Sequence, residues 1–109
     1  MFALKDLSLE NSFTSRLTQV EVLRTIMKVD PVYIPRAVAL LKQIEFIEMT
    51  DQIIDDACRY PQSITLKSSD AIQMATAERI LDSDDELVTF DKQMAINAER
   101  LGLKVRATF

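Results

Sequence analysis

The sequence predicts an α/β protein in which a parallel sheet is flanked by helices in a three-layer sandwich. Short strand-like segments alternate with longer helix-like segments, and this order is typical of parallel strands joined by helical crossovers. A length of 109 residues suits one small domain with one core, so we expect a single domain over residues 1–109. The chain is 48% hydrophobic and 28% charged, a balance that argues against a disordered or fibrous protein.

Four segments have the pattern of strands. Residues 13–17 follow the turn-prone pair Asn11-Ser12, and residues 44–49 alternate apolar and polar side chains as a half-buried strand does. Residues 87–90 form a short buried strand, and residues 104–107 form the last one. Residues 1–10 alternate only weakly between apolar and charged types, which fits a short helix or a leader.

Five segments have the signals of helices. In the first, an apolar stripe begins after Thr18, and Thr18-x-x-Glu21 has the form of a capping box. Asp30-Pro31 ends this helix, because the residue before a proline is pushed out of the helical conformation. Gly102 closes the last helix as its C-cap. The expected helices cover residues 18–29, 33–43, 50–60, 68–81 and 91–101.

The residue types that are rare or absent exclude several chemistries. The chain has no His, one Cys and one Gly. It therefore has no Ser-His-Asp triad, no zinc site built on imidazole, no internal disulfide and no glycine-rich phosphate loop. The groups that remain for chemistry are carboxylates, hydroxyls, Lys and Arg.

The charge and the hydropathy of the chain limit its partners. A formal net charge of −4 means that an anionic partner would need a local basic patch or bound cations. The longest apolar run, residues 37–41, is far shorter than a membrane span. The first residues do not resemble a signal peptide, so we expect a cytoplasmic protein without a membrane partner.

Two aspartates occupy positions where open parallel sheets bind ligands, at the carboxyl ends of strands. Asp91 follows the expected strand 87–90, and the helical repeat puts its carboxylate on the inward side of the next helix. Asp70 heads another apolar stripe. The alternative for each is helix capping, because Asp is preferred in the first turn, where it binds free backbone amides.

Glu21 is a third candidate. The capping box explains it, and Arg24 and Lys28 lie on its helix face as ordinary ion-pair partners. If the helices that carry Glu21, Asp70 and Asp91 start at one edge of the sheet, three carboxylates meet in one crevice. Clustered oxygen ligands of this kind suit Mg²⁺ or Mn²⁺.

The same segments resemble a known family. Residues 15–24, 66–77 and 87–91 are similar to the conserved blocks of PIN domains, and most of all to the toxins of VapBC toxin-antitoxin pairs. Residues 94–105 resemble the last helix and strand of that family. The resemblance covers about residues 11–107, and the order and spacing of the blocks make it specific.

The resemblance implies a metal-dependent ribonuclease that an antitoxin neutralises. By the match, Glu21, Asp70 and Asp91 take the second, third and fourth places of an acidic quartet and hold Mg²⁺ or Mn²⁺, and Thr89 is the hydroxyl residue that orients the site. The cations would activate water against an RNA phosphodiester and stabilise the charge that develops on phosphorus. Solvated surface charge is the ordinary role of the nearby cations, but three of them are candidates for contact with the RNA backbone: Arg16, Arg24 and Lys92.

One block of the family has no counterpart. PIN domains begin with a strand that ends in the first Asp of the quartet, and Phe2–Asp6 is the only candidate for it. Only residues 7–12 separate that candidate from the next strand, whereas a crossover between parallel strands takes about a dozen residues. We therefore expect a PIN-like fold in which the N-terminal strand and the first Asp are missing.

This expectation leaves alternatives open. One is a truncated, catalytically impaired PIN domain that acts only as an antitoxin-binding or self-associating module. Another is a homo-oligomer, or a partner chain that donates the missing strand, because an exposed strand edge favours association. A phosphoacceptor receiver domain fits the size, but it needs an acidic pair after the first strand and a Lys after the last, which are not in place.

Overall fold

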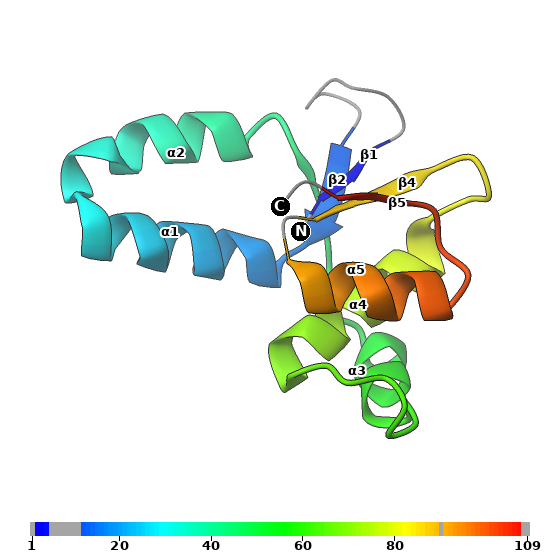
Figure 1. The fold of residues 1–109 in the computed structure, drawn as a ribbon. Helices are drawn as coiled ribbons and strands as arrows, with labels where there is room; N and C mark the ends of the chain where they lie inside the picture. The colour runs from blue at the N-terminus through cyan, green and yellow to red at the C-terminus, as the bar shows by residue number, and fades with distance from the viewer. Residues whose placement is uncertain (1, 5–11, 90, 108–109) are drawn as a thin grey trace.

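A five-stranded sheet of order β3-β2-β1-β4-β5 forms the centre of the fold (Figure 1). The computed structural model describes residues 2–4, 12–89 and 91–107. The strands are β1 (Phe2–Leu4), β2 (Ser12–Ser15), β3 (Glu45–Ile47), β4 (Glu86–Thr89) and β5 (Val105–Ala107). The helices are α1 (Leu17–Val29), the 3-10 helix η2 (Pro31–Tyr33), α2 (Ile34–Leu41), α3 (Asp51–Cys58), α4 (Ser68–Ile80) and α5 (Lys92–Arg100).

Four of the strands point in one direction. β2 pairs with β3 and β4 pairs with β5, both in parallel. The central strand β1 is antiparallel to both of its neighbours, with Ala3 opposite Phe13 on one side and opposite Leu87 on the other. The carboxyl ends of β2, β3, β4 and β5 therefore lie at one edge of the sheet.

The α/β class and the PIN-like arrangement of helices and parallel strands are confirmed, and the observed elements follow the expected ones closely. The difference lies at the N-terminus, where residues 2–4 form a strand and not a helix or a leader. This strand occupies the central position that we expected to be empty, but with its direction reversed. Phe2 is level with Val88 and Leu4 with Glu86, so the chain after Leu4 leaves from the edge opposite the carboxyl ends. Asp6 lies outside the described residues.

The reversed strand has a simple physical reason. β2 and β4 each have a row of backbone amides and carbonyls facing the centre of the sheet, and these groups need partners. A strand of either direction supplies hydrogen bonds to both rows, and a parallel entry would need a crossover that residues 5–11 are too short to make. The sheet is therefore mixed.

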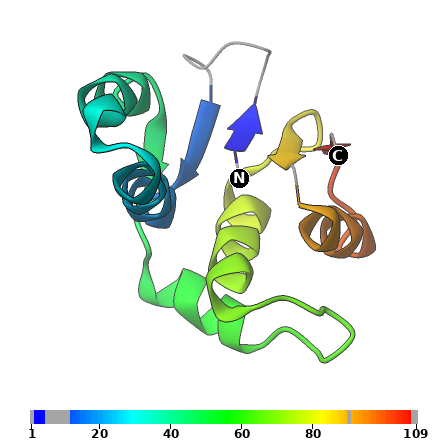
Figure 2. The ribbon, with the colours of Figure 1, turned by 60° about the vertical axis from the view of Figure 1, so that its left-hand side comes forward.

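The core lies between the β4 side of the sheet and two helices, α4 and α5, that cover the same face (Figure 2). Met74 and Ala77 of α4 meet Leu87 of β4 and Met94 and Ala98 of α5, and each is at most 3% exposed. The apolar stripe that begins at Asp70 does face the sheet, as its spacing predicts. This packing fixes the starts of α4 and α5 relative to the end of β4.

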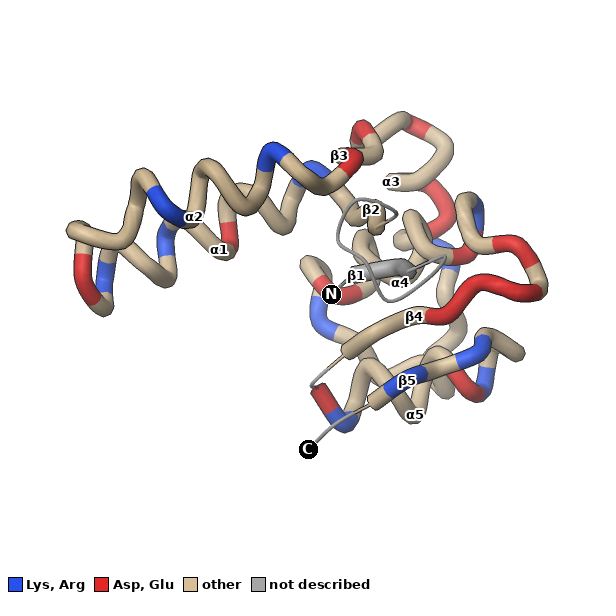
Figure 3. The backbone as a smooth tube through the Cα atoms, turned by 90° about the horizontal axis from the view of Figure 1, so that it is seen from above, with Lys and Arg blue, Asp and Glu red and all other residues tan. Residues whose placement is uncertain are grey.

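α1 and α2 form a hairpin that projects away from the sheet (Figure 3). The turn between them follows the expected proline break, and the Asp30 carboxylate accepts a hydrogen bond from the Val32 amide at 3.1 Å. No helix in the part of the chain that the structure describes has both the length and the apolar character needed to cross a membrane.

The predicted capping box at the start of α1 is wrong. The N-cap is Arg16, whose side chain caps nothing, and the Ser15 hydroxyl instead accepts a hydrogen bond from the Leu17 amide at 3.2 Å. The side chains of Thr18 and Glu21 are both engaged with α4. Thr18 and Glu21 therefore contact α4, whereas the capping box would have kept both side chains at the start of α1.

Candidate active site

Three acidic side chains gather where the parallel strands end. α1 starts directly after β2 and carries Glu21 just beyond its first turn, Asp70 lies in the first turn of α4, and Asp91 separates β4 from α5. Burial raises the pKa of Asp70, and the negative charges of Asp91 and then Glu21 raise it further, while Lys67 opposes them. The three carboxylates are thus close enough for two of them to act electrostatically on the third.

Asp70 is not a helix cap. The N-cap of α4 is Lys67, and within the described residues the Asp70 side chain has no hydrogen-bond donor. It is only partly exposed. Its ionised form is therefore only partly solvated, and Lys67 compensates it only in part, which is the situation of a carboxylate that a cation can stabilise.

Asp91 does cap its helix, as the alternative interpretation held. Its Oδ1 accepts a hydrogen bond from the Met94 amide at 3.0 Å, and the residue is exposed. The prediction that this carboxylate points inward is wrong, because Asp91 has an extended backbone (φ −100°, ψ 123°) and the helical repeat does not apply to a residue before the helix. The capping bond uses Oδ1 and not Oδ2.

Thr89 is buried at the end of β4, at 4% exposure. Its hydroxyl accepts a hydrogen bond from the Asp91 amide at 3.1 Å. The contact fixes the turn by which the chain leaves the sheet and enters α5, and so the direction in which Asp91 leaves the strand. Thr89 thus acts on the backbone of Asp91 and not on its carboxylate.

Glu21 has a partner that the sequence did not predict. The side-chain amide of Gln73 donates to Glu21 Oε1 at 3.0 Å and to Thr18 Oγ1 at 2.8 Å. The expected pairing of Glu21 with Arg24 and Lys28 does not form among the described residues, although all three line one shallow hollow of α1. The available signal was the position of Gln73, three residues after Asp70 on the buried side of an apolar helix.

The cations predicted to follow RNA have different surroundings. The Arg16 side chain already has partners within the protein. It pairs with Glu48 at 2.9 Å, and its guanidinium lies 5.1 Å from the centre of the Phe46 ring. Arg24 and Lys92 are exposed, and neither makes an ion pair with a described residue. Arg24 is on the helix of Glu21, and Lys92 follows Asp91 directly, so both remain candidates for contact with an anion.

The donor chemistry of the three carboxylates suits a hard divalent cation, which prefers oxygen ligands. Burial and then the charges of Asp91 and Glu21 raise the pKa of Asp70, and a bound cation would offset both effects. As they stand, no three acidic or thiol side chains of residues 2–4, 12–89 and 91–107 are close enough together to hold one ion. The three carboxylates therefore have the right ligand chemistry but do not form a closed cation site in this arrangement.

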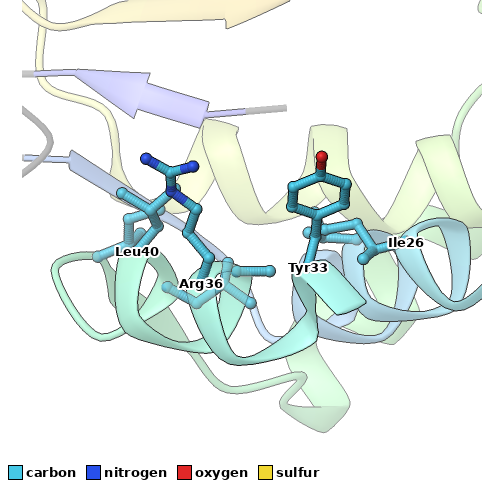
Figure 4. A pocket seen from close by; sticks show the side chains of 8 residues that line it. Ile26, Tyr33, Arg36 and Leu40 are labelled. Carbon is cyan, nitrogen blue, oxygen red and sulfur yellow. The ribbon is translucent and has the colours of Figure 1, made fainter. Parts of the chain in front are cut away.

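An apolar groove lies between α1 and α2, beside this site (Figure 4). It has a volume of about 360 Å³. Two of its lining residues, Val22 and Ile26, also line the hollow that contains Glu21, so the groove continues toward the carboxylates. The other lining residues are Tyr33, Arg36, Ala37, Leu40, Leu41 and Ile44. Tyr33 and Leu40 are 54% and 47% exposed.

Carboxylates at the ends of parallel strands are the arrangement that the resemblance implies, although the antiparallel β1 makes the observed sheet mixed. Comparison with known proteins agrees with the family. The sequence profile of the PIN domain matches residues 2–100, and the chain belongs to the PIN-domain family. It is 36% identical over 96 residues to "Ribonuclease VapC35" of Mycobacterium tuberculosis, in the CDC 1551 / Oshkosh and the H37Rv strains alike. That match covers 86% of this chain and 70% of the relative, and it makes the chain a PIN domain of the VapC type.

A solved structure gives the same result. The fold is similar to a chain of a toxin-antitoxin complex from Klebsiella pneumoniae, with a TM-score of 0.60 and 29% identity. The match covers 74% of this chain and 64% of the solved one. The present chain thus spans somewhat less than two thirds of that neighbour, so the neighbour's complete activity is not transferred from the likeness alone.

Proposed function

We propose that this chain is a VapC-type toxin, an endoribonuclease that hydrolyses RNA phosphodiester bonds with a divalent cation and is neutralised by an antitoxin. The observation that carries the proposal is the electrostatic coupling of Asp70 to Asp91 and Glu21 at the carboxyl edge of the sheet. The charges of Asp91 and Glu21 disfavour ionised Asp70 in the protein alone, and a bound divalent cation would offset that repulsion. The name of its VapC relative supports the same reaction class.

In this mechanism Glu21, Asp70 and Asp91 would hold Mg²⁺ or Mn²⁺. A bound cation would supply an activated water and would neutralise charge on the phosphate. Asp70 is the least exposed of the three, and Asp91 uses Oδ1 for the helix amide, so Oδ2 would be the oxygen that it offers. Thr89 holds the turn from which Asp91 projects. In the hydrolysis a water oxygen would bond to phosphorus as the bond to the leaving oxygen breaks, and the proton that the water loses would be balanced by the one that the leaving oxygen takes up.

The substrate is bound by few fixed cations. Arg24 and Lys92 flank the carboxylates in sequence and are free of ion pairs among the described residues, so they contact RNA phosphates. An acidic chain thereby binds a polyanion through bound metal and two local cations, and not through an overall positive surface. Because the substrate is cellular RNA, the proposed place of action is the cytoplasm.

The test is cleavage of a fluorophore-quencher single-stranded RNA by the purified chain with Mn²⁺, with Mg²⁺ and with EDTA. We expect cleavage only with metal, and its loss to the level of the EDTA control in Asp70→Asn and Asp91→Asn. Asp84→Asn is the matched control, because Asp84 is exposed in the turn before β4, and it should cleave like the wild type. Wild-type cleavage no faster than that of the Asp70→Asn, Asp91→Asn double variant would sink the nuclease proposal.

The apolar groove between α1 and α2 supports a second candidate, a module that binds an antitoxin without cleaving RNA. An amphipathic helix buries its apolar face in such a groove, and the groove leads to the hollow beside Glu21. We propose that the antitoxin binds there in either case, and self-association through the same exposed apolar side chains remains a proposal. Co-purification with the antitoxin that Leu40→Asp abolishes, in a chain that binds no Mn²⁺, would favour the module over the nuclease.

A further inference from the structure

Gln73 is a buried polar residue of α4 that the proposed mechanism does not use; it is 2% exposed and lies three residues after Asp70. A glutamine amide at a buried helix position is costly unless its groups are paired. Both of its N–H groups are paired, one with Glu21 and one with Thr18. Its Oε1 is buried and has no hydrogen-bond donor among the described residues.

The orientation of this amide follows from its neighbours. Rotating it by 180° would place Oε1 against the Glu21 carboxylate, which accepts hydrogen bonds and cannot donate when ionised. Glu21 therefore requires the N–H side. With the N–H side turned to Glu21 and Thr18, Oε1 lies where no described residue offers it a donor.

Thr18 and Thr14 hold the amide from the other side. Thr18 Oγ1, which accepts from Gln73, lies 2.8 Å from Thr14 Oγ1. Thr14 belongs to β2, Thr18 to α1, and both are buried. The contacts thus run from the sheet through α1 to α4 and return to α1 at Glu21, so the position of the amide is set by three elements.

We infer that Gln73 is a positioning residue that fixes the Glu21 carboxylate relative to Asp70 for cation binding. Glu21 is exposed, and an exposed Glu side chain samples several rotamers. The bond from Gln73 selects one of them and ties it to α4, the helix that also carries Asp70. One helix therefore supplies one ligand and orients another, and this inference rests on the proposed metal site.

Gln73→Met separates this role from a purely structural one. Methionine has nearly the same length, removes both N–H donors, and also removes the unpaired buried oxygen, so the effects on folding oppose each other. We expect the melting temperature of the metal-free protein to change little. We expect the dissociation constant for Mn²⁺, measured by calorimetry on the full chain, to rise about 10- to 100-fold, the usual loss when a hydrogen-bond partner of a metal ligand is removed.

Thr76→Val is the matched control. Thr76 is also buried on α4, and its hydroxyl bonds only the Ile72 carbonyl of its own helix. This variant removes a buried side-chain hydrogen bond from the same helix without touching Glu21. It should bind Mn²⁺ like the wild type, whatever it does to the melting temperature.

A double-mutant cycle with Glu21→Ala completes the test. If Gln73 acts through Glu21, Gln73→Met changes Mn²⁺ affinity in the wild-type background and changes it little when Glu21 is already absent. Equal effects in both backgrounds, or Mn²⁺ affinity unchanged by Gln73→Met, overturn the inference and leave the metal site standing. A wild type that binds no Mn²⁺ overturns the proposed site together with the inference.

Discussion

Asn97 joins α5 to the loop that leads into α4. Replacing it with alanine tests how much this side chain stabilises the fold near the candidate site. The residue is fully buried. Its Oδ1 accepts from the Thr65 amide at 2.9 Å, and its Nδ2 donates to Thr65 Oγ1 at 3.2 Å and to the Gln93 carbonyl at 2.8 Å. Asn97→Ala removes all three hydrogen bonds. At about 1 kcal/mol each, the free energy of unfolding should fall by about 3 kcal/mol.

For a chain of this size a loss of 1 kcal/mol lowers the melting temperature by about 4 °C, so we expect a decrease of about 12 °C. Urea unfolding followed by circular dichroism gives the free energy, and an unchanged m-value shows that the folded and unfolded states keep their exposure. Gln93→Ala is the control, because Gln93 is exposed and, among the described residues, its side chain accepts a single hydrogen bond, from the Thr65 hydroxyl at 3.3 Å. A loss below about 1 kcal/mol for Asn97→Ala, or one equal to that of Gln93→Ala, would refute this account of the loop.

Two further substitutions test single features. Burial, Asp91 and Glu21 raise the pKa of Asp70 above its ordinary 3.8, so the folded state binds this proton more tightly than the unfolded state, and stability falls as the pH rises from below 3.8 through the raised folded pKa. Asp70→Asn removes that loss, and at pH 7 without metal the variant should melt above the wild type; an equal or lower melting temperature contradicts the electrostatic argument. Gly102→Ala should lower the free energy of unfolding in urea by about 1 kcal/mol. The cause is the backbone, because Gly102 has φ +84° and no atom of the described residues beyond its chain neighbours lies within 4 Å of an added Cβ. Gly102→Asn should lose less, and an alanine variant as stable as the wild type would show that this conformation is not strained.

The helices and most strands were predictable because their ends are set by neighbouring residues. Asp30-Pro31 stops α1, Thr50 caps α3 by accepting from the Ile53 amide at 3.2 Å, and Gly102 follows α5 with the positive φ that a glycine C-cap supplies. These signals act over three or four residues. They do not depend on distant parts of the chain, so they can be recognised in the sequence.

For the candidate site, the sequence predicted where the three carboxylates lie in the fold but not what they contact. The spacing of Asp70 and Asp91 after strand and loop placed both at one edge of the sheet. The partner of Glu21 could not be read locally, because Gln73 is 52 residues away and the capping-box spacing offered a nearer explanation. The presence of β1 in the sheet depends on the two strands beside it, and its antiparallel direction follows from the short link of residues 5–11 and not from its three residues.

Two energetic costs lie one turn apart on α4, at the proposed metal site. Ionised Asp70 is disfavoured by its burial and by two like charges, and Gln73 buries an oxygen without a donor among the described residues. A cation bound by the carboxylates would offset the electrostatic cost of ionised Asp70. Free metal at 100 times its dissociation constant stabilises the folded wild type by about 2.7 kcal/mol and leaves a variant that cannot bind it unchanged. Asp70→Asn should therefore melt above the wild type in EDTA and below it in saturating Mn²⁺, and melting temperatures that keep the same order in both conditions would mean that Asp70 is not a metal ligand.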